Sequence, residues 1–170
     1  MAMDSIRIRL ALKADLTQIN DIYNHYVAHT PITFDLEPIT TNQRVDWFGQ
    51  FSADGRHQLF VAEQEGRVIG FAYAHAFMQK RAYDTTVETT VYCAHDETGR
   101  RVGTQLYMAL FEALAGQDLR MAVAGITLPN DASVALHEAF GFKPTGVLHE
   151  IGRKFDKYWD VGWYEKRLSS

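Results

Sequence analysis

A run of β-branched residues that leads into a loop of glycine and arginine constrains the fold of this chain most strongly. Residues 85–93 (TTVETTVYC) have high strand propensity and are expected to form a central strand. A loop at residues 98–103 follows, and then a helix and an apolar strand at residues 121–126. The apolar face of that helix carries Leu106, Leu110, Phe111 and Leu114. Strand, loop, helix and strand in this order predict a βαβ unit.

The chain before this unit predicts a strand and two helices. Residues 6–10 alternate apolar and charged side chains, as a half-buried strand does. Residues 16–27 repeat apolar side chains with helical spacing until Pro31 ends the helix. A second helix is expected from a threonine cap at residues 40–41 to the Asp-Gly pair at residues 54–55.

The remaining patterns add a hairpin, a fourth helix and two closing strands. Residues 58–63 and 67–74 flank a Glu-Gly pair, which is typical of an antiparallel hairpin. A helix is expected at residues 130–140, ended by Gly141. The last two strands are expected at residues 145–155 and 159–168. The chain is therefore predicted to be an α/β (α+β) protein, with residues 1–170 forming a single domain.

Charge and cysteine content exclude several classes of partner. The formal net charge of the 170 residues is −4, and no cluster of lysine and arginine marks a nucleic-acid or membrane surface. Cys93 is the only cysteine, which excludes an internal disulfide and fits a reducing compartment. The amino terminus lacks the pattern of a signal peptide. A cytoplasmic protein without nucleic-acid or membrane partners is expected.

Five separated segments of the sequence match the motifs of a known protein family in order and spacing. They lie at residues 21–26 (DIYNHY), 83–92 (YDTTVETTVY), 98–107, 128–142 (LPNDASVALHEAFGF) and 157–162 (KYWDVG). In order and spacing the chain resembles the GCN5-related N-acetyltransferases (GNAT), and within them the phosphinothricin and methionine sulfoximine or sulfone acetyltransferases. The resemblance implies the GNAT fold: a mixed, mostly antiparallel twisted sheet of about seven strands flanked by about four helices. It also implies acetyl-CoA as co-substrate, no metal, and a homodimer.

The loop at residues 98–104 is the expected cofactor cradle. Free backbone N–H groups and the positive end of a helix dipole can hold a pyrophosphate there, although a polar turn with a helix cap is the alternative from the loop alone. Thr98 and Arg101 depart from the family's Gln/Arg and Gly. Arg101 must therefore turn outward, where it either obstructs the cofactor or, with Arg100, pairs with a phosphate. The expected cofactor-binding residues are Val91, Tyr92, Cys93, Gly99, Arg100, Arg101, Val102, Gly103, Thr104, Asn130 and Ser133.

Glu88 and His137 are the expected catalytic residues. An ammonium must lose a proton before it attacks a thioester, and a carboxylate inside an uncharged strand is costly without a task or a partner. The alternative for Glu88 is an ion pair with Lys80 or Arg81. The resemblance implies that Glu88 is the general base. It also places His137 where many members carry a tyrosine that protonates the departing thiolate, although a histidine satisfied within the core is equally compatible.

Two nearby residues have competing interpretations. The resemblance implies that the strand parts from its neighbour at residues 91–93 and offers backbone N–H groups to the pantetheine and the thioester oxygen. Cys93 is expected to be a small apolar residue, because direct transfer needs no acyl-enzyme. Asn130 opens the fourth helix, where it can cap N–H groups, bind the pantetheine arm, or do both.

The substrate is the least determined part of the prediction. The resemblance places eight residues around the amine: Asn24, Tyr26, Phe34, Arg81, Tyr83, Tyr107, Tyr158 and Trp159. Aromatic side chains at helical spacing are more often part of a core, and the pair Lys80-Arg81 would suit a carboxylate or phosphinate. The chain is expected to acetylate the primary amine of a small amino-acid-like molecule. The alternatives are a protein N-terminus, a polyamine, or a non-catalytic acyl-CoA-binding module.

Overall fold

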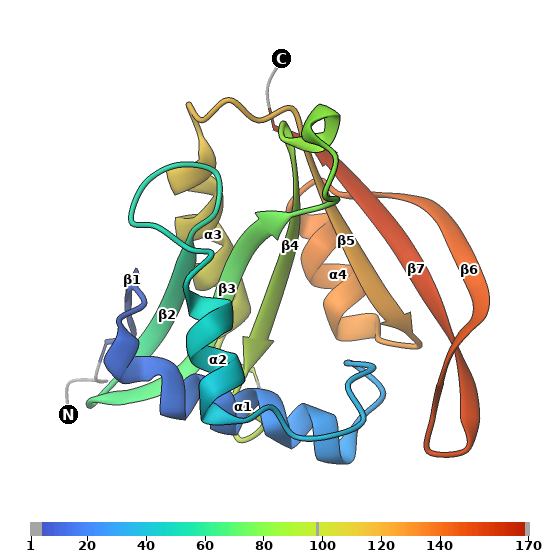
Figure 1. The fold of residues 1–170 in the computed structure, drawn as a ribbon, viewed down its shortest axis with the longest axis horizontal. Coiled ribbons are helices and arrows are strands. Elements are labelled where there is room, and N and C mark those ends of the chain that lie inside the picture. The colour runs from blue at the N-terminus through green and yellow to red at the C-terminus, as the bar shows by residue number, and fades with distance from the viewer. Residues whose placement is uncertain (1–4, 98, 169–170) are drawn as a thin grey trace.

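The computed structural model describes residues 5–97 and 99–168, and its strands form one seven-stranded sheet (Figure 1). The strands are β1 (Arg7–Leu10), β2 (Leu59–Gln64), β3 (Arg67–Ala76), β4 (Thr86–Cys93), β5 (Met121–Leu128), β6 (Lys143–Lys154) and β7 (Lys157–Arg167). Their order across the sheet is β1-β2-β3-β4-β5-β7-β6. Every neighbouring pair is antiparallel except β4 and β5, which are parallel. The predicted mixed, mostly antiparallel sheet is confirmed, and so is the βαβ unit.

Four α-helices cover the two faces of this sheet (Figure 1). They are α1 (Leu16–His29), α2 (Thr41–Phe48), α3 (Val102–Leu114) and α4 (Asp131–Ala139), and two short 3-10 helices lie at Lys13–Asp15 and Arg81–Tyr83. Helices α1 and α2 lie on one face, and α3 and α4 lie on the other. None of the helices in the described residues is long and apolar enough to cross a membrane.

Helix α2 begins where the sequence predicts but ends earlier. The Thr40 hydroxyl accepts a hydrogen bond from the backbone N–H of Gln43, whose side chain in turn accepts from the backbone N–H of Thr40. The helix ends at Phe48, and Gly49 is its C-cap. The predicted extension to residues 54–55 is wrong, because Phe51 packs on the Trp47 ring at 4.7 Å from outside the helix. Trp47 and Phe51 are four residues apart, which is the spacing of neighbours on one helix face. Here the two rings contact each other although Phe51 lies beyond the end of the helix.

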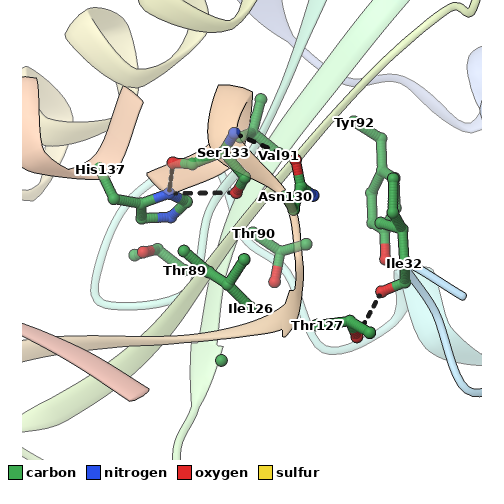
Figure 2. Close-up of a pocket in the computed structure, with 11 residues that line it drawn as sticks. Ile32, Thr89, Thr90, Val91, Tyr92, Ile126, Thr127, Asn130, Ser133 and His137 are labelled. Atoms are coloured by element: carbon green, nitrogen blue, oxygen red, sulfur yellow. Dashed lines mark hydrogen bonds between the residues drawn. The ribbon is translucent and has the colours of Figure 1, made fainter. Parts of the chain in front are cut away.

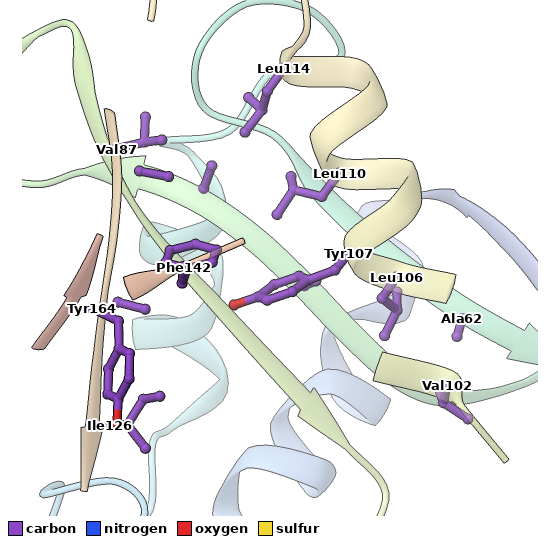
Figure 3. Close-up of a cluster of buried hydrophobic side chains, with 14 of the residues drawn as sticks. Ala62, Val87, Val102, Leu106, Tyr107, Leu110, Leu114, Ile126, Phe142 and Tyr164 are labelled. Atoms are coloured by element: carbon purple, nitrogen blue, oxygen red, sulfur yellow. The ribbon is translucent and has the colours of Figure 1, made fainter. Parts of the chain in front are cut away.

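Each face of the sheet buries its own hydrophobic core. The larger core lies under α3, where Leu106, Tyr107 and Leu110 are fully buried (Figure 3). The second core lies under α1 and α2 and contains Ile19 and Phe71, which are also fully buried. The sheet therefore lies between two close-packed layers, with one pair of helices on each face.

Strands β4 and β5 separate near the middle of the sheet. Their pairing is limited to residues 86–88 of β4 and 121–123 of β5, although β4 continues to Cys93 and β5 to Leu128. The diverging arrows of β4 and β5 are visible in Figure 1. The backbone edge of β4 from residue 89 onward is therefore free of β5, as the resemblance implies.

Candidate active site

A narrow cavity of about 50 Å³ occupies the gap between β4 and β5 (Figure 2). Residues 89–92 of β4 form one wall and Ile126 and Thr127 of β5 form the other, while Asn130, Ser133 and His137 reach in from α4. The gap exposes backbone polar groups of a strand to a confined space. Such a channel can bind a slender, amide-containing chain by backbone hydrogen bonds.

A wider cavity of about 320 Å³ adjoins this gap on the side of Glu88. The two cavities share Ile32, Thr90, Tyr92, Gly125 and Thr127 in their walls. The remaining residues of the wider cavity, hereafter the amine cleft, are Thr33, Phe34, Tyr73, His75, Glu88, Val161 and Trp163. Glu88 therefore lies beside the point where a narrow channel meets a broader one.

The carboxylate of Glu88 is half-buried and faces a histidine. Its side chain is 27% exposed, and burial raises the pKa of Glu88 above its ordinary value. The imidazole of His75 faces this carboxylate, and its Nε2 lies 3.9 Å from Oε2 of Glu88, because the two residues are register partners on β3 and β4. Burial lowers the pKa of His75, so its imidazole is mainly neutral at pH 7. Lys80 and Arg81, the partners considered for Glu88, are both exposed.

His137 is held at both ring nitrogens by the protein. Nδ1 lies 2.7 Å from the Ser133 carbonyl oxygen and therefore donates to it, which leaves Nε2 to accept from the Tyr107 hydroxyl at 2.9 Å. The side chain is buried, and burial lowers the pKa of His137. In this tautomer Nε2 carries no proton. The contacts favour the alternative of a core-satisfied histidine over the general-acid role.

The loop at residues 98–104 contains two residues with positive φ. Gly99 has φ 77° and Arg101 has φ 56°, so both take the left-handed conformation. Arg101 is the N-cap of α3, is exposed and forms no side-chain cap hydrogen bond, while the backbone N–H of Gly103 in the first turn is hydrogen-bonded to the Cys93 sulfur. Thr98 lies outside the described residues.

The residues around Arg101 have more fixed surroundings. Arg100 donates to Glu97 at 2.7 Å and to Gln64 at 2.8 Å, so its guanidinium is already engaged within the loop. Val102 and Gly103 are buried, and a Cβ on Gly103 would meet Leu136 Cδ2 at 3.2 Å. This close approach fixes the start of α3 against α4. Thr104 is half-buried in the first turn of the helix.

Residues 91–93 connect the gap to α1. Val91 and Tyr92 line the gap, while the carbonyl oxygen of Cys93 accepts a hydrogen bond from the Tyr26 hydroxyl at 2.6 Å. Burial raises the pKa of the Cys93 thiol to about 11, so the thiolate is scarce at neutral pH. This agrees with a small apolar residue and gives no support to covalent catalysis.

Asn130 can serve both of its predicted roles. Its Oδ1 accepts a hydrogen bond from the backbone N–H of Ser133 at 3.2 Å, so it caps α4. Asn130 and Ser133 also line the gap between β4 and β5. The cap therefore orients an amide side chain toward the channel.

The eight residues predicted around the amine are not all brought together. Phe34 lines the amine cleft. Asn24 instead holds the backbone of Ile39, with hydrogen bonds of 2.8 Å and 3.0 Å, and Tyr26 bonds to the end of β4. Tyr107 is fully buried in the core, where its hydroxyl faces His137, because its ring is needed to fill the space under α3.

The other four residues lie at or near the surface. Arg81 is exposed and Tyr83 is 42% exposed on the 3-10 turn before β4. Tyr158 is 60% exposed near the turn between β6 and β7, and the indole Nε1 of Trp159 donates to the Lys154 carbonyl at 2.9 Å. These four do not line the amine cleft.

Several residues of the amine cleft are absent from the sequence-based prediction. Tyr73 and His75 reach it from β3, and Trp163 reaches it from β7. Alternate residues of a strand face the same side of the sheet, so His75 lies on the same face of β3 as Tyr73. The alternation along the predicted hairpin strand therefore points to His75. Their approach to Glu88 depends on the register between β3 and β4, which the sequence pattern leaves open.

Comparison with known proteins identifies the protein family to which this chain belongs. The model of the acetyltransferase (GNAT) domain matches residues 8–163. The chain belongs to this family and is an acyltransferase enzyme. It is 47% identical over 165 residues to the phosphinothricin N-acetyltransferase of Streptomyces coelicolor, with 96% of each chain covered.

A second relative and a solved structure extend this likeness. The chain is 33% identical over 164 residues to the L-methionine sulfoximine/L-methionine sulfone acetyltransferase of Pseudomonas paraeruginosa, with 96% of this chain and 95% of the relative covered. A phosphinothricin acetyltransferase from Sinorhizobium meliloti, solved in complex with acetyl-CoA, matches with a TM-score of 0.91 and 30% identity. That match covers 96% of this chain and 89% of the other.

Proposed function

We propose that this enzyme transfers the acetyl group of acetyl-CoA to the primary amine of a small amino-acid-like substrate of the phosphinothricin, methionine sulfoximine or methionine sulfone type. The observation that carries the proposal is the position of Glu88, a half-buried carboxylate in the cleft that adjoins the gap between β4 and β5. The names of the relatives support this substrate class.

The residues of the gap fit the donor. The first turn of α3, where Arg101 forms no side-chain cap, offers backbone N–H groups to a pyrophosphate, and the free edge of β4 together with Asn130 suits the amides of a pantetheine arm. Acetyl-CoA supplies a thioester, whose carbonyl carbon is the electrophile. The residues described do not include a cluster of three or more His, Cys, Asp or Glu side chains arranged to hold a metal ion.

Glu88 prepares the nucleophile in this proposal. Its carboxylate accepts a proton from the substrate ammonium, because a carboxylate whose pKa is raised by burial is a stronger base than an exposed one. The freed amine attacks the thioester carbonyl, the C–N bond forms and the C–S bond breaks. The nitrogen releases its second proton after the C–N bond forms, and this proton passes to the departing thiolate, while N–H groups on the free edge of β4 stabilise the developing oxyanion. His75 keeps the surroundings of Glu88 polar while remaining mainly neutral itself.

The proposal includes a cytoplasmic homodimer. The edge strand β6 and the turn after it expose four apolar side chains, Val147, Leu148 and Ile151 on β6 and Phe155 in the turn, between 42% and 58% of their surface. An exposed apolar edge strand favours pairing with a second copy of the chain. The single cysteine, half-buried and not in a disulfide, fits a reducing compartment.

A thiol-release assay tests the proposed function. Purified protein is mixed with acetyl-CoA and a panel of phosphinothricin, methionine sulfoximine, methionine sulfone, a polyamine and an N-terminal peptide. We expect release for the amino-acid group, and a loss of about 10²–10⁴ in kcat for Glu88→Gln with little change in acetyl-CoA affinity. Equal activity of Glu88→Gln and the unmodified enzyme would contradict the role of Glu88. Release only with the polyamine or the peptide would contradict the substrate class.

A further inference from the structure

A buried arginine on α2 retains a donor without a partner. Arg44 is 4% exposed, and its Nε donates to Asn20 Oδ1 at 3.0 Å. Its guanidinium lies between two aromatic rings, 4.7 Å from the centroid of Tyr23 and 4.5 Å from that of Trp47. Within the described part of the chain, Nη2 is buried without a hydrogen-bond partner. An unpaired N–H of a buried cation is costly, so a ligand oxygen that pairs with it binds favourably.

Arg44 lines a cavity of about 160 Å³ that shares Tyr73 with the amine cleft. The lining residues are Tyr23, Asp35, Ile39, Gln43, Arg44, Trp47 and Tyr73. Tyr73 also lines the amine cleft and stands two residues before His75, the partner of Glu88. Two residues along a strand span about 7 Å, which an extended side chain of methionine length can bridge. A substrate amine at Glu88 can therefore place its far end toward Arg44.

The charges in this cavity indicate what kind of group it accepts. Asp35 shares the cavity with Arg44, and its carboxylate accepts a hydrogen bond from the Tyr23 hydroxyl at 2.5 Å. A guanidinium and a carboxylate in one cavity leave a net charge near zero. An uncharged oxygen acceptor, such as a sulfonyl oxygen, can pair with Nη2 without strong repulsion from Asp35.

We propose that Arg44 is a specificity-determining residue that donates a hydrogen bond from Nη2 to an oxo group at the far end of the amine substrate. The inference rests on the proposed function in so far as the amine lies at Glu88. It assigns the recognition of the oxo group to α2, whereas Lys80 and Arg81, which the sequence suggests for anion binding, are exposed and outside the amine cleft.

The matched pair of methionine sulfone and methionine tests this assignment, because the two molecules differ only in the sulfonyl oxygens. The kcat/KM ratio of sulfone to methionine is measured for the unmodified enzyme, Arg44→Met and Arg44→Lys. We expect the ratio to fall about tenfold to hundredfold in Arg44→Met, mainly through KM for the sulfone. Arg44→Lys keeps the charge but lacks the second donor arm, and it should lose most of the preference as well.

The ratio is internal to each protein, so a partial loss of folded enzyme does not change it. Arg56→Met is the control for the loss of one arginine, since Arg56 pairs with Asp118 at the surface. A ratio that stays the same in both Arg44 variants would overturn the proposal, as would equal kcat/KM for the two substrates in the unmodified enzyme.

Calorimetric titration separates this inference from the proposed function. Methionine sulfone and methionine are titrated into each protein without a donor. Tighter binding of the sulfone that disappears in Arg44→Met supports the inference even if no acetyl transfer occurs, in which case only the proposed function fails. Equal binding of the two molecules to the unmodified protein contradicts the role of Arg44 whether or not the enzyme is active.

Discussion

Glu88 and His75 form a pair of titratable groups whose pKa values are moved in opposite directions by the same cause. Burial raises the pKa of the carboxyl and lowers the pKa of the imidazole, since each is shifted toward its neutral form. The pKa values of the two groups therefore approach each other. A neutral imidazole beside the carboxylate leaves Glu88 without an ion pair at this contact, which suits acceptance of a proton from an amine.

The pH dependence of the reaction follows from the raised pKa of Glu88. Below that pKa the carboxyl is protonated and cannot accept the proton of the ammonium, so kcat/KM should fall about tenfold per pH unit on the acid side. His75→Phe removes a polar neighbour and should move this limb to higher pH. The measurement is a pH–rate profile for the unmodified enzyme and for His75→Phe. A limb that stays at the same pH in His75→Phe would show that His75 does not influence Glu88.

A structural role for His137 predicts a loss of stability rather than a change of mechanism. His137→Phe leaves the Ser133 carbonyl and the Tyr107 hydroxyl without their partner and should lower the free energy of unfolding by about 1–3 kcal/mol. Chemical denaturation measures this loss. The alkaline side of the pH–rate profile is the control, because it should keep its position if His137 donates no proton to the thiolate.

The sequence predicts some of these residues and not others for a physical reason. Glu88 is conspicuous as a lone charge in a strand, and Asn130 stands at a helix start, so both can be found from local pattern. His75 only continues the alternation of the β3 strand, and Arg44 has no local signal. Their positions depend on strand register and on the return of the chain over the sheet, which are tertiary properties.

At the scale of elements, helix α3 begins at a residue with an unfavourable backbone. Arg101 has φ 56°, a conformation that costs a residue with a side chain about 1–3 kcal/mol, and its exposed guanidinium makes no cap. Gly99 takes the left-handed conformation without this cost. Arg101 therefore carries a local strain that a glycine at this position would avoid.

Arg101→Gly separates strain from binding. The variant should be as stable as the unmodified protein or up to about 1 kcal/mol more stable, because glycine accepts the left-handed conformation. If Arg101 pairs with a phosphate, the affinity for acetyl-CoA should fall severalfold and depend less on salt. Calorimetric titration at two salt concentrations measures this. A large gain in affinity would show that the side chain only obstructs the loop.

Elements were more predictable than their ends and contacts. The hairpin of β2 and β3 turns at Glu65 and Gly66, both with positive φ, as the Glu-Gly pair suggests. The parting of β4 and β5 could be predicted only through the resemblance, because it depends on how two strands distant in the sequence diverge in space. The end of α2 was missed because Phe51 has helical spacing but loop geometry.

At the scale of the molecule, the hairpin of β6 and β7 forms one side of the amine cleft. The Lys154 ammonium donates to the Thr33 carbonyl at 2.8 Å, and the ring of Phe34 lies against Gly152, where a Cβ would meet it at 2.2 Å. Only glycine allows this approach. The loop after α1 and the last hairpin therefore hold each other in place around the cleft.

The proposed dimer makes a prediction at this scale. Ile151→Glu places a charge on the exposed apolar edge of β6 and should shift the protein from dimer to monomer. Sedimentation at several protein concentrations measures the change. Lys13→Glu, a surface change on a 3-10 helix remote from β6 in the sequence, is the control. If the unmodified protein sediments as a monomer, or Ile151→Glu remains a dimer, the edge of β6 is not the interface.

The contact between Phe34 and Gly152 affects the order in which parts of the protein can fold during translation. The elements around the gap, β4, α3, β5 and α4, are complete once residue 139 has left the ribosome. The amine cleft also needs Val161 and Trp163 of β7, together with Gly152, on which Phe34 rests. During translation, the elements around the gap are therefore synthesised before the amine cleft can form. The cleft is completed only when β7, near the end of the chain, has been synthesised.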